Sequence, residues 1–332
     1  MDEDGIIQTY FAPLAAGAEG AFDLTDDAAA IACPNGAELV VTTDALISGI
    51  HFLPDDPPAD IAAKALGVNL SDLAGKGAEP LAYTLSLSLP DPVSETWLAG
   101  FRDGLAAVQD AHGIHLVGGD TTRSPDATML SITAFGTVPA GRMVRRSTAR
   151  PGDLLYVTGT IGDAALGLLL VTEDPRGTRW NLDPEAHAFL VSRYRRPAPR
   201  TGMASALRGH VSAALDVSDG LLIDTVRLCH ASNVTATIRA DKVPLSRAAR
   251  SCLAADPDAL ETILTGGDDY ELLLAVPAEK AEAFARAAGA AGTSLHHIGE
   301  LAGPASSLPP VTVLDPDGTP LHFHRPGYTH FA

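Results

Sequence analysis

Cysteine, aromatic and basic residues are scarce in this sequence of 332 residues. Only 3 cysteines occur, aromatic residues make up 5%, and 23 Lys and Arg are outnumbered by 41 Asp and Glu, which gives a formal net charge of −18. So acidic a surface repels the nucleic-acid backbone and anionic lipid, which disfavours both as partners. It also repels an anionic substrate unless cations or local basic residues intervene.

The three cysteines, Cys33, Cys229 and Cys252, are scattered and form no Cys-x-x-Cys pair. We therefore expect reduced thiols in the core of a cytoplasmic protein. Long hydrophobic runs are also lacking, because the apolar stretch at residues 164–171 is far too short to cross a bilayer. The acidic beginning, MDEDGIIQTY, has no apolar run typical of a signal peptide.

The common nucleotide-binding loops are absent as well. No G-x-x-x-x-G-K-[ST] loop, no Rossmann G-x-G-x-x-G and no protein-kinase catalytic loop occurs. The stretch GTIGDAALG, residues 159–167, matches a glycine-rich loop only in part and predicts a turn that starts a helix. No Cys/His spacing typical of zinc is present. If this protein binds a nucleotide, its binding site must therefore be built from residues other than those of the common nucleotide-binding loops.

Strand and helix patterns alternate along the chain. Alternating or β-branched runs predict strands, and apolar residues at helical spacing predict helices. One helix is expected to begin at a capping residue, Ser94, and to end at Gly113. The expected strands are residues 38–43, 81–89, 128–138, 153–160, 234–238 and 271–276, and the expected helices are residues 59–75, 94–113 and 221–232.

A polar, turn-rich stretch at residues 146–153 indicates a domain boundary. We therefore predict a first domain at residues 1–150 and a second at residues 151–332, in keeping with the length of the chain. The mixture of strands and helices places the protein in the α/β or α+β class.

The most informative feature is a set of carboxylates beside Gly, Ser or Thr. Each cluster alone is explained by a turn or a helix N-cap, since Asp and Ser favour both. Repeated hydroxyl-flanked carboxylates are instead typical of oxygen ligands for Mg²⁺, which bridges to substrate phosphates. Such ligands indicate phosphoryl transfer, in which charge is neutralised and the reactants are held in line. The clusters are residues 24–29, 41–46, 69–75, 118–122, 216–220 and 266–271.

These clusters, in this order, resemble those of the thiamine-monophosphate kinase family, in the aminoimidazole ribonucleotide synthetase superfamily. The resemblance runs almost end to end. GGDT and SDG recur across the superfamily, whereas TTD…GIHF with NLSDLA and GGDDYEL is more specific to these kinases. The matching stretches are DDAA (26–29), TTDALISGIHF (42–52), KALGVNLSDLAGKGAEP (64–80), GGDTTRSP (118–125), RRSTARPGDLLYVTGTIGD (145–163), DVSDGLLID (216–224), GGDDYEL (266–272) and GYTHF (327–331).

The resemblance implies a fold, an activity and partners. The fold would be the two-domain aminoimidazole ribonucleotide synthetase-like fold. Its N-terminal mixed sheet with helices would bind ATP and Mg²⁺ and pair across a homodimer, and its C-terminal α/β domain would complete the active site. The activity would be direct in-line transfer of the γ-phosphoryl group of ATP onto thiamine monophosphate, giving thiamine diphosphate. Several Mg²⁺ ions, a cytoplasmic location, and no nucleic-acid or membrane partner are also expected.

The resemblance further implies site residues, position by position. Asp44, Asp72 and Asp120 would carry catalysis through bound metal rather than as a general base, because the acceptor phosphate is already anionic. His51, Asp268 and Arg325 would contact thiamine monophosphate. The nucleotide would meet Gly119, Asp120, Arg146 and Ser218, and the metal shell would comprise Asp27, Thr42, Thr43, Asp44, Asp72, Asp120, Asp216 and Asp219. Gly119 is expected there because only a bare backbone approaches phosphates closely, and Arg146 because a guanidinium forks onto phosphate oxygens.

Two positions depart from the family pattern. Asp268 stands where the family often has a glutamate, and Arg325 stands where it often has an aromatic residue that stacks on the substrate. Since thiamine carries a cationic thiazolium, a facing guanidinium is unfavourable. Three alternatives follow: the local backbone shifts, Phe323 or Tyr328 stacks instead, or substrate recognition differs. The alternatives are a related ATP-dependent synthetase or kinase with another acceptor, and a non-catalytic Mg-nucleotide-binding protein.

Overall fold

The computed structural model describes residues 3–304 and 309–329. The chain divides into two compact units, Met1–Leu73 with Ala78–Met143, and Ala74–Gly77 with Val144–Ala332. The main division thus falls a few residues before the boundary expected from the sequence. A short segment at the end of helix α2 (Pro58–Gly75) and the turn after it belong to the second unit.

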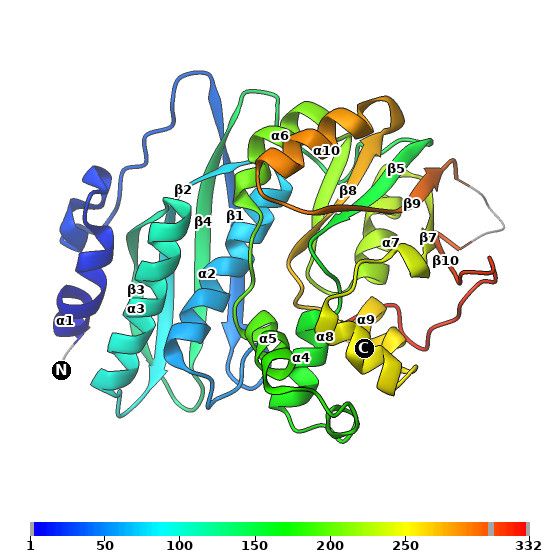
Figure 1. Ribbon diagram of the computed structural model, residues 1–332. Helices are drawn as coiled ribbons and strands as arrows, with labels where there is room; N and C mark the ends of the chain where they lie inside the picture. Colours follow the sequence, from blue (N-terminus) through cyan, green and yellow to red (C-terminus); the bar gives the residue numbers. More distant parts are fainter. Residues whose placement is uncertain (1–2, 305–308, 330–332) are drawn as a thin grey trace. The chain divides into compact units, whose positions relative to one another are not determined.

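The first unit is built on a four-stranded sheet in the order β1-β4-β2-β3 (Figure 1). Strands β1 and β2 pair antiparallel with β4, whereas β2 pairs parallel with β3, so the sheet is mixed. Strand β3 lies at an edge and has one neighbour in the sheet. The strands are β1 (Ala37–Ile47), β2 (Glu79–Pro90), β3 (His115–Ser124) and β4 (Met129–Pro139).

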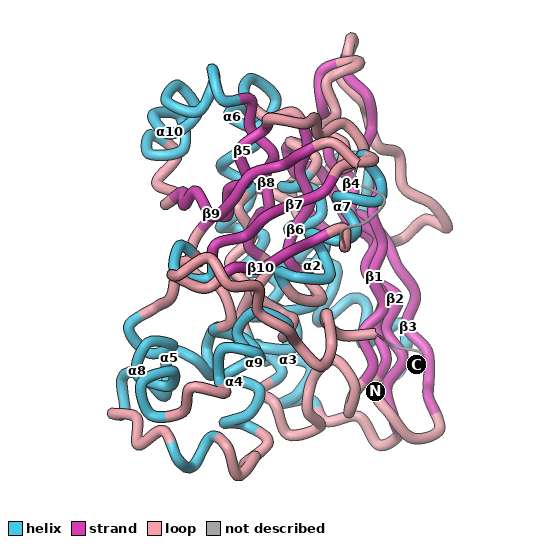
Figure 2. Tube along the Cα trace, turned by 90° about the vertical axis from the view of Figure 1, so that its right-hand side faces the viewer, coloured by secondary structure: helices cyan, strands magenta, loops and turns pink. Residues whose placement is uncertain are grey.

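Two helices, α2 and α3 (Glu95–His112), lie on the same side of this sheet (Figures 1 and 2). Ser94 caps α3 by accepting a hydrogen bond from the Trp97 amide, and Gly113 ends it in the left-handed conformation at φ 64°, as the sequence predicts. Short helical turns precede the sheet: α1 (Glu3–Ile6), η1 (Ile7–Phe11), η2 (Ala12–Ala15) and η3 (Glu19–Leu24).

The two faces of this sheet differ because neighbours along a strand point to opposite faces. Tyr83, Leu85 and Ile132 share one face and are buried. On the other face, Val41 is 54% and Met129 is 45% exposed. The N-terminal segment packs against only part of the first unit's sheet, in a small apolar cluster. The first unit therefore has one packed face and one largely open face.

The second unit is built on a six-stranded sheet in the order β10-β7-β9-β5-β8-β6. Strands β10 and β7 are parallel, and the other neighbouring pairs are antiparallel. Figure 2 shows the strands of this unit as magenta segments. They are β5 (Asp153–Thr158), β6 (Ala213–Val217), β7 (Thr235–Arg239), β8 (Glu271–Pro277), β9 (Leu295–Ala302) and β10 (Val311–Leu314).

Hydrophobic cores lie on both faces of the second sheet. Leu273 of β8 joins the core that contains Leu166, and its neighbour Leu274 joins the core that contains Leu207 and Phe284. A strand covered on both faces has an uninterrupted apolar sequence, which explains LLLAV at residues 272–276. The helices are α4 (Asp163–Val171), α5 (Pro184–Arg195), α6 (Ala204–His210), α7 (Leu221–Ser232), α8 (Arg247–Ala255), α9 (Ala259–Thr265) and α10 (Ala281–Ala290), with short turns η4 (Gly177–Arg179), η5 (Thr201–Met203), η6 (Ala240–Lys242) and η7 (Ala278–Lys280).

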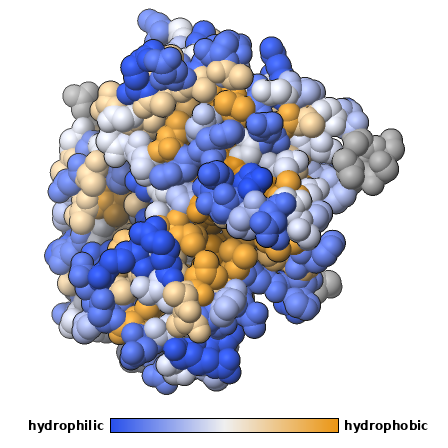
Figure 3. Space-filling model, turned by 45° about the vertical axis from the view of Figure 1, so that its right-hand side comes forward, coloured by the Kyte–Doolittle hydropathy of each residue, from blue (hydrophilic) through white to orange (hydrophobic). Residues whose placement is uncertain are grey.

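The expected strands and helices are found within a few residues of their predicted ends, and Gly162 starts α4 as the glycine-rich stretch predicts. The cysteines are free, as expected, but Cys33 is exposed rather than in the core, because it lies in the irregular segment before β1. No helix of the described residues is long and apolar enough to span a membrane. The face seen in Figure 3 is mainly hydrophilic, with separate hydrophobic patches.

Candidate active site

The Gly-Gly-Asp-Thr-Thr stretch lies within strand β3 and not in a turn. Gly119 pairs with Leu85 of β2, and Asp120 pairs with Ser86. The turn interpretation of this cluster is therefore wrong, because the parallel ladder keeps the backbone extended. Gly119 also has a packing reason to be glycine. A Cβ there would lie 2.0 Å from the Leu85 carbonyl oxygen, whereas a Cβ at Gly118 would meet nothing closer than 3.8 Å.

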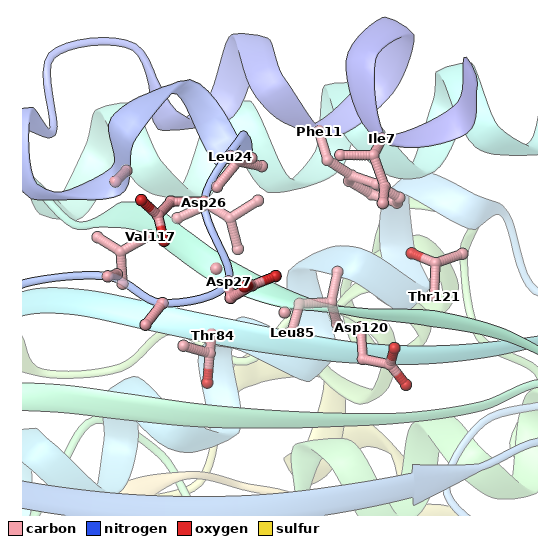
Figure 4. A pocket seen from close by; sticks show the side chains of 16 residues that line it. Ile7, Phe11, Leu24, Asp26, Asp27, Thr84, Leu85, Val117, Asp120 and Thr121 are labelled. Carbon is pink, nitrogen blue, oxygen red and sulfur yellow. The ribbon is translucent and has the colours of Figure 1, made fainter. Parts of the chain in front are cut away.

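Strand β3 borders a cavity of about 390 Å³ in the first unit (Figure 4). Ile7 and Phe11 reach it from the N-terminal helical turns, opposite the strand residues. Asp27, Gly119 and Asp120 all line it, so three of the residues expected to meet nucleotide or metal share one cavity. Its volume lies in the range of small-ligand sites.

A second group of expected ligands lies on β1 and α2. The Thr42 hydroxyl donates a hydrogen bond to the Asp72 carboxylate, which joins the strand to the helix. Thr43, the next residue along β1, donates its hydroxyl to the Ile132 carbonyl at 3.1 Å and accepts from the Thr133 hydroxyl at 3.1 Å. The structure therefore brings Thr42 and Asp72 together and directs Thr43 toward β4.

His51 lies in the turn after β1 and is half-buried. Its Nδ1 accepts a hydrogen bond from the Ile47 amide at 3.1 Å, which leaves the proton of the neutral ring on Nε2. The ring is thus oriented by the backbone of its own turn. Its expected contact with thiamine monophosphate stays a prediction.

The sheet does not bring Asp44 and Asp120 together within one chain. Asp44 pairs with Ile132, Ile132 with Leu85, and Leu85 with Gly119, so these residues share a face. Asp120 is the next residue along β3 and points to the other face. Strands β1 and β3 are also separated by three interstrand spacings, roughly 14 Å at about 4.8 Å each. One ion therefore cannot bind both carboxylates of the same chain.

The oxygen donors of the first unit fit Mg²⁺ in smaller sets. Among residues 3–304 and 309–329, no three His, Cys, Asp or Glu side chains are arranged to hold an ion. Mg²⁺ is commonly held by one or two carboxylates, with waters and substrate phosphates completing its octahedron. Asp27 with Asp120 at the cavity, and Thr42 with Asp72 between β1 and α2, are sets of that kind. The expected eight-residue shell stays a prediction.

In the second unit, strand β6 ends at Val217, directly after Asp216, and the chain turns at residues 218–220 into helix α7. The buried Asp224 holds this turn. Its Oδ2 accepts hydrogen bonds from the amides of Ser218 at 3.1 Å, Asp219 at 3.0 Å and Gly220 at 3.2 Å. Gly220 has φ 127°, a conformation that other residues rarely adopt. Ser218, which is expected to meet the nucleotide, and Asp219, which is expected in the metal shell, are thus fixed by a residue that the sequence interpretation did not single out.

Arg227, one turn further along α7, links the two acidic residues. Its Nη1 donates to the carboxylates of both Asp219 and Asp224. Burial raises the pKa of Asp224 to about 6, and the positive charge of Arg227 opposes that shift. A sequence signal existed for Asp224, since an acid in the first turn of a helix commonly accepts the amides that precede it.

Asp268 lies in the loop before β8, beside the same turn. Its amide donates to the Ser218 carbonyl at 2.8 Å, and the Tyr270 amide donates to the Val217 carbonyl at 2.9 Å. Asp268 and Tyr270 have φ values of 72° and 50°, in the left-handed region where non-glycine residues are strained. The loop is therefore held in an unfavourable conformation by its contacts with the end of β6.

The other acids of the GGDDYEL stretch are structural. Asp269 is fully buried, and its Oδ2 accepts the Gly162 amide at 2.6 Å at the start of α4. Burial raises the pKa of Asp269 well above its usual range. Glu271 accepts from Arg200 at 2.7 Å and from Arg193 at 3.0 Å. Of these three acids, Asp268 is the half-buried one placed beside the turn.

The two arginines expected at the site, Arg146 and Arg325, are exposed. The C-terminal segment that carries Arg325 returns to the turn described above, where the Tyr328 amide donates to the Asp219 carbonyl at 3.0 Å. The expected GYTHF stretch ends at residue 331, and its residues 330–331 lie outside the described part. The contacts of both arginines with ligands stay predictions.

Comparisons with known proteins agree with this two-unit organisation. Residues 25–138 match the model of the AIR synthase related protein, N-terminal domain, and residues 150–307 match that of the C-terminal domain. A thiamine-monophosphate kinase from Salmonella typhimurium is 43% identical over 307 residues, which cover 92% of this chain and 91% of the relative. The chain belongs to the thiamine-monophosphate kinase family.

Solved structures of thiamine-monophosphate kinases have the same fold. The enzyme from Stenotrophomonas maltophilia is 42% identical, with a TM-score of 0.79 over 89% of this chain and 90% of that chain. The structure named "AaThiL complexed with AMPPCP and TMP" is 29% identical, with a TM-score of 0.77 over 90% of this chain and 89% of that chain. The predicted fold, a two-domain α/β fold of the aminoimidazole ribonucleotide synthetase type, is confirmed.

Proposed function

We propose that this chain transfers the γ-phosphoryl group of ATP to the phosphate of thiamine monophosphate, giving thiamine diphosphate and ADP. Its end-to-end membership in the thiamine-monophosphate kinase family is the observation that carries the proposal. The relative whose structure contains AMPPCP and TMP binds an ATP analogue and a second ligand together, as such a transfer requires. The acceptor oxygen is already anionic near neutral pH, so the enzyme must neutralise charge and align the reactants.

We place the nucleotide phosphates at the polar side of the first unit's cavity. Asp120 and Asp27 line that side, and Gly119 leaves the backbone of β3 bare beside them. Ile7 and Phe11 form an uncharged side that suits the rest of a nucleotide. Arg146 is exposed and can fork onto phosphate oxygens in an otherwise acidic chain.

Mg²⁺ belongs to the same proposal, because two anions must approach each other near carboxylates. Bound Mg²⁺ would neutralise the phosphate oxygens between which the phosphoryl group passes. The chain's own side chains would hold the ion, and the hydrogen bonds described above would orient those side chains. The proposed ligands in the first unit are Asp27, Thr42, Thr43, Asp44, Asp72 and Asp120, and those in the second unit are Asp216 and Asp219.

The deciding experiment is an ATP assay with purified protein and Mg²⁺, offering thiamine monophosphate, thiamine or no acceptor in parallel. Thiamine diphosphate and ADP formed only with the monophosphate would support the proposal. ATP binding without formation of thiamine diphosphate would contradict the proposal. It would indicate a related enzyme of the same superfamily that uses a different acceptor. The substrate-side residues Asp268 and Arg325, which depart from the family pattern, would then be examined first.

Asp120→Asn tests the cavity directly. The substitution keeps the shape of the side chain but removes its charge, and we expect kcat to fall on the order of 10²–10³-fold, as for other groups that stabilise transition-state charge. Asp110→Asn, an exposed acid on α3, is the matched control and should leave kcat unchanged. Near-normal turnover of the Asp120 variant would refute a role for this carboxylate.

We further propose that the protein is a cytoplasmic homodimer in which the open sheet faces of two first units pair. Val41 and Met129 on that face are 54% and 45% exposed, and burying them would stabilise an association. Light scattering after gel filtration should give twice the chain mass. Val41→Asp should shift the mass toward that of one chain, and an unchanged mass would count against this interface.

A further inference from the structure

The turn at residues 218–220 is organised by a buried carboxylate. Asp224 is 1% exposed, and one of its oxygens accepts the amides of Ser218, Asp219 and Gly220 at 3.0–3.2 Å. Three consecutive amides directed at one atom fix the backbone of all three residues. Without that acceptor, each of these amides would lose its partner inside the protein, and the turn would lose its conformation.

Asp224 thus occupies all three backbone amides of the turn at residues 218–220. Consecutive amides in a turn ordinarily form an anion site, which is how many proteins bind phosphate. Here the anion is a side chain of the protein itself. A phosphate therefore cannot take the same three amides while Asp224 occupies them. Glycine at position 220 is compatible with a phosphate-binding turn, but the hydrogen bonds exclude that use.

The carbonyl groups of the turn are also engaged. The Ser218 carbonyl accepts the Asp268 amide at 2.8 Å, and the Asp219 carbonyl accepts the Tyr328 amide at 3.0 Å. The groups that remain for a ligand are the Ser218 hydroxyl and the carboxylate oxygen of Asp219 that does not accept from Arg227, both on half-buried residues. The Asp219 carboxylate suits a hard cation and repels a bare phosphate, and the Ser218 hydroxyl can supply a second oxygen ligand beside it.

The same set of contacts orients the Asp219 carboxylate. Arg227 donates to one oxygen of Asp219 and, at 2.6 Å, to the second oxygen of Asp224. Asp224 thus acts on Asp219 twice, through the Asp219 amide and through the guanidinium. Loss of the Asp224 charge would free Arg227 to bind Asp219 alone and to compete with a cation for it.

We infer that Asp224 is a positioning residue, which occupies the amides of residues 218–220 so that this turn presents oxygen ligands to a divalent cation instead of amide donors to a phosphate. The inference rests on the proposed function. It assigns the cation-facing orientation of Ser218 and Asp219 to hydrogen bonds made by a side chain that does not itself touch substrate. The chemistry required of the ligand is that of Mg²⁺ or a similar hard cation.

The test uses Asp224→Asn and Asp224→Ala in the full chain. The Mg²⁺ concentration for half-maximal ATP turnover is measured with the nucleotide fixed, together with hydrogen exchange of the amides at residues 218–220. We expect half-saturation to rise on the order of 10–100-fold in the alanine variant, the range for residues that orient metal ligands. The asparagine variant keeps an acceptor oxygen of similar shape and should fall between the alanine variant and the parent. The turn amides should exchange faster in the same order.

The matched control is Asp183→Ala. Asp183 also accepts a backbone amide, that of Ala186 at 2.7 Å, but it caps helix α5. Its loss should lower stability without changing the Mg²⁺ half-saturation. An equal shift in the Asp183 and Asp224 variants, or no shift in the Asp224 variants, would overturn the inference.

Failure of the proposed function can be distinguished from failure of the positioning role of Asp224. If the parent protein forms no thiamine diphosphate, the assay fails for every variant, while hydrogen exchange still reports the turn. Mg²⁺ added alone should then slow exchange around residues 216–220 in the parent and not in Asp224→Ala. Equal exchange in both proteins, with and without Mg²⁺, would overturn the positioning role.

Discussion

Replacing Gly119 by alanine should destabilise the first unit as well as impair activity. Neither Gly118 nor Gly119 has a positive φ, so an alanine can adopt the backbone conformation at either position. The new Cβ at position 119 would lie 2.0 Å from the Leu85 oxygen and 2.9 Å from its carbonyl carbon. Since ordinary contacts begin near 3.4 Å, β3 must move away from β2 by more than an ångström.

The cost can be estimated from the contacts that this movement disturbs. Overpacking of a well-packed site costs about 1–3 kcal/mol, and each weakened ladder hydrogen bond about 1 kcal/mol. Because β3 is an edge strand, it can shift without displacing a further neighbour. We therefore expect the free energy of unfolding to fall by about 3 kcal/mol. For a unit of this size, that corresponds to a midpoint lower by about 6–12 °C.

Thermal unfolding followed by circular dichroism measures this effect, with urea unfolding as a second measurement. Gly118→Ala is the matched control, because its Cβ would meet only the Thr84 methyl group at 3.8 Å. The control should melt within about 2 °C of the parent, as surface substitutions commonly do. If Gly119→Ala melts with the control and only its KM for ATP rises, the packing argument is refuted. The approach of phosphate to a bare backbone would then be the reason for the glycine.

Two further predictions follow from the surface and the buried thiols. Burial raises the pKa of Cys229 and of Cys252 to about 12, whereas Cys33 is exposed. Ellman titration of the native protein at about pH 8 should therefore give one fast-reacting thiol, and the Cys33→Ser variant should give none. A second fast-reacting thiol would contradict the burial of Cys229 and Cys252. The Glu261 carboxylate raises the pKa of His324 above its ordinary value. The stabilisation from this pair is therefore fully present at pH values below the ordinary pKa of histidine, and it is lost as the pH rises through the raised pKa. Amide exchange at residues 321–329 should therefore quicken above about pH 7, and the same pH dependence in His324→Gln would exclude this cause.

Much of the secondary structure is specified locally. Helix α7 occupies the predicted residues 221–232, and α3 begins and ends at the predicted Ser94 and Gly113. Helical spacing and caps are properties of a few consecutive residues, so they can be read without knowing the fold. Strand β3 could not be read in this way. Its Gly-Gly-Asp stretch is extended because β2, more than thirty residues earlier in the chain, supplies a parallel ladder.

The division of roles among the acidic residues is decided by tertiary structure. In the sequence, Asp268, Asp269 and Glu271 belong to one acidic stretch and are chemically alike. In the fold, Asp269 is buried against the start of α4, Glu271 binds two arginines, and Asp268 lies in a strained loop beside the turn that carries Ser218. Burial and partners, which come from elements distant in the chain, determine what each carboxylate does.

The fold class and the family could be predicted from the sequence, because periodicity, caps and motif order are local features of the chain. Which carboxylates and hydroxyls come together depends on the tertiary structure. It joined Thr42 to Asp72, placed Asp44 and Asp120 on opposite faces of one sheet, and set Asp224 beneath residues 218–220. Strand pleating and hydrogen-bond register fix the direction of each side chain, and the register depends on pairing between distant segments.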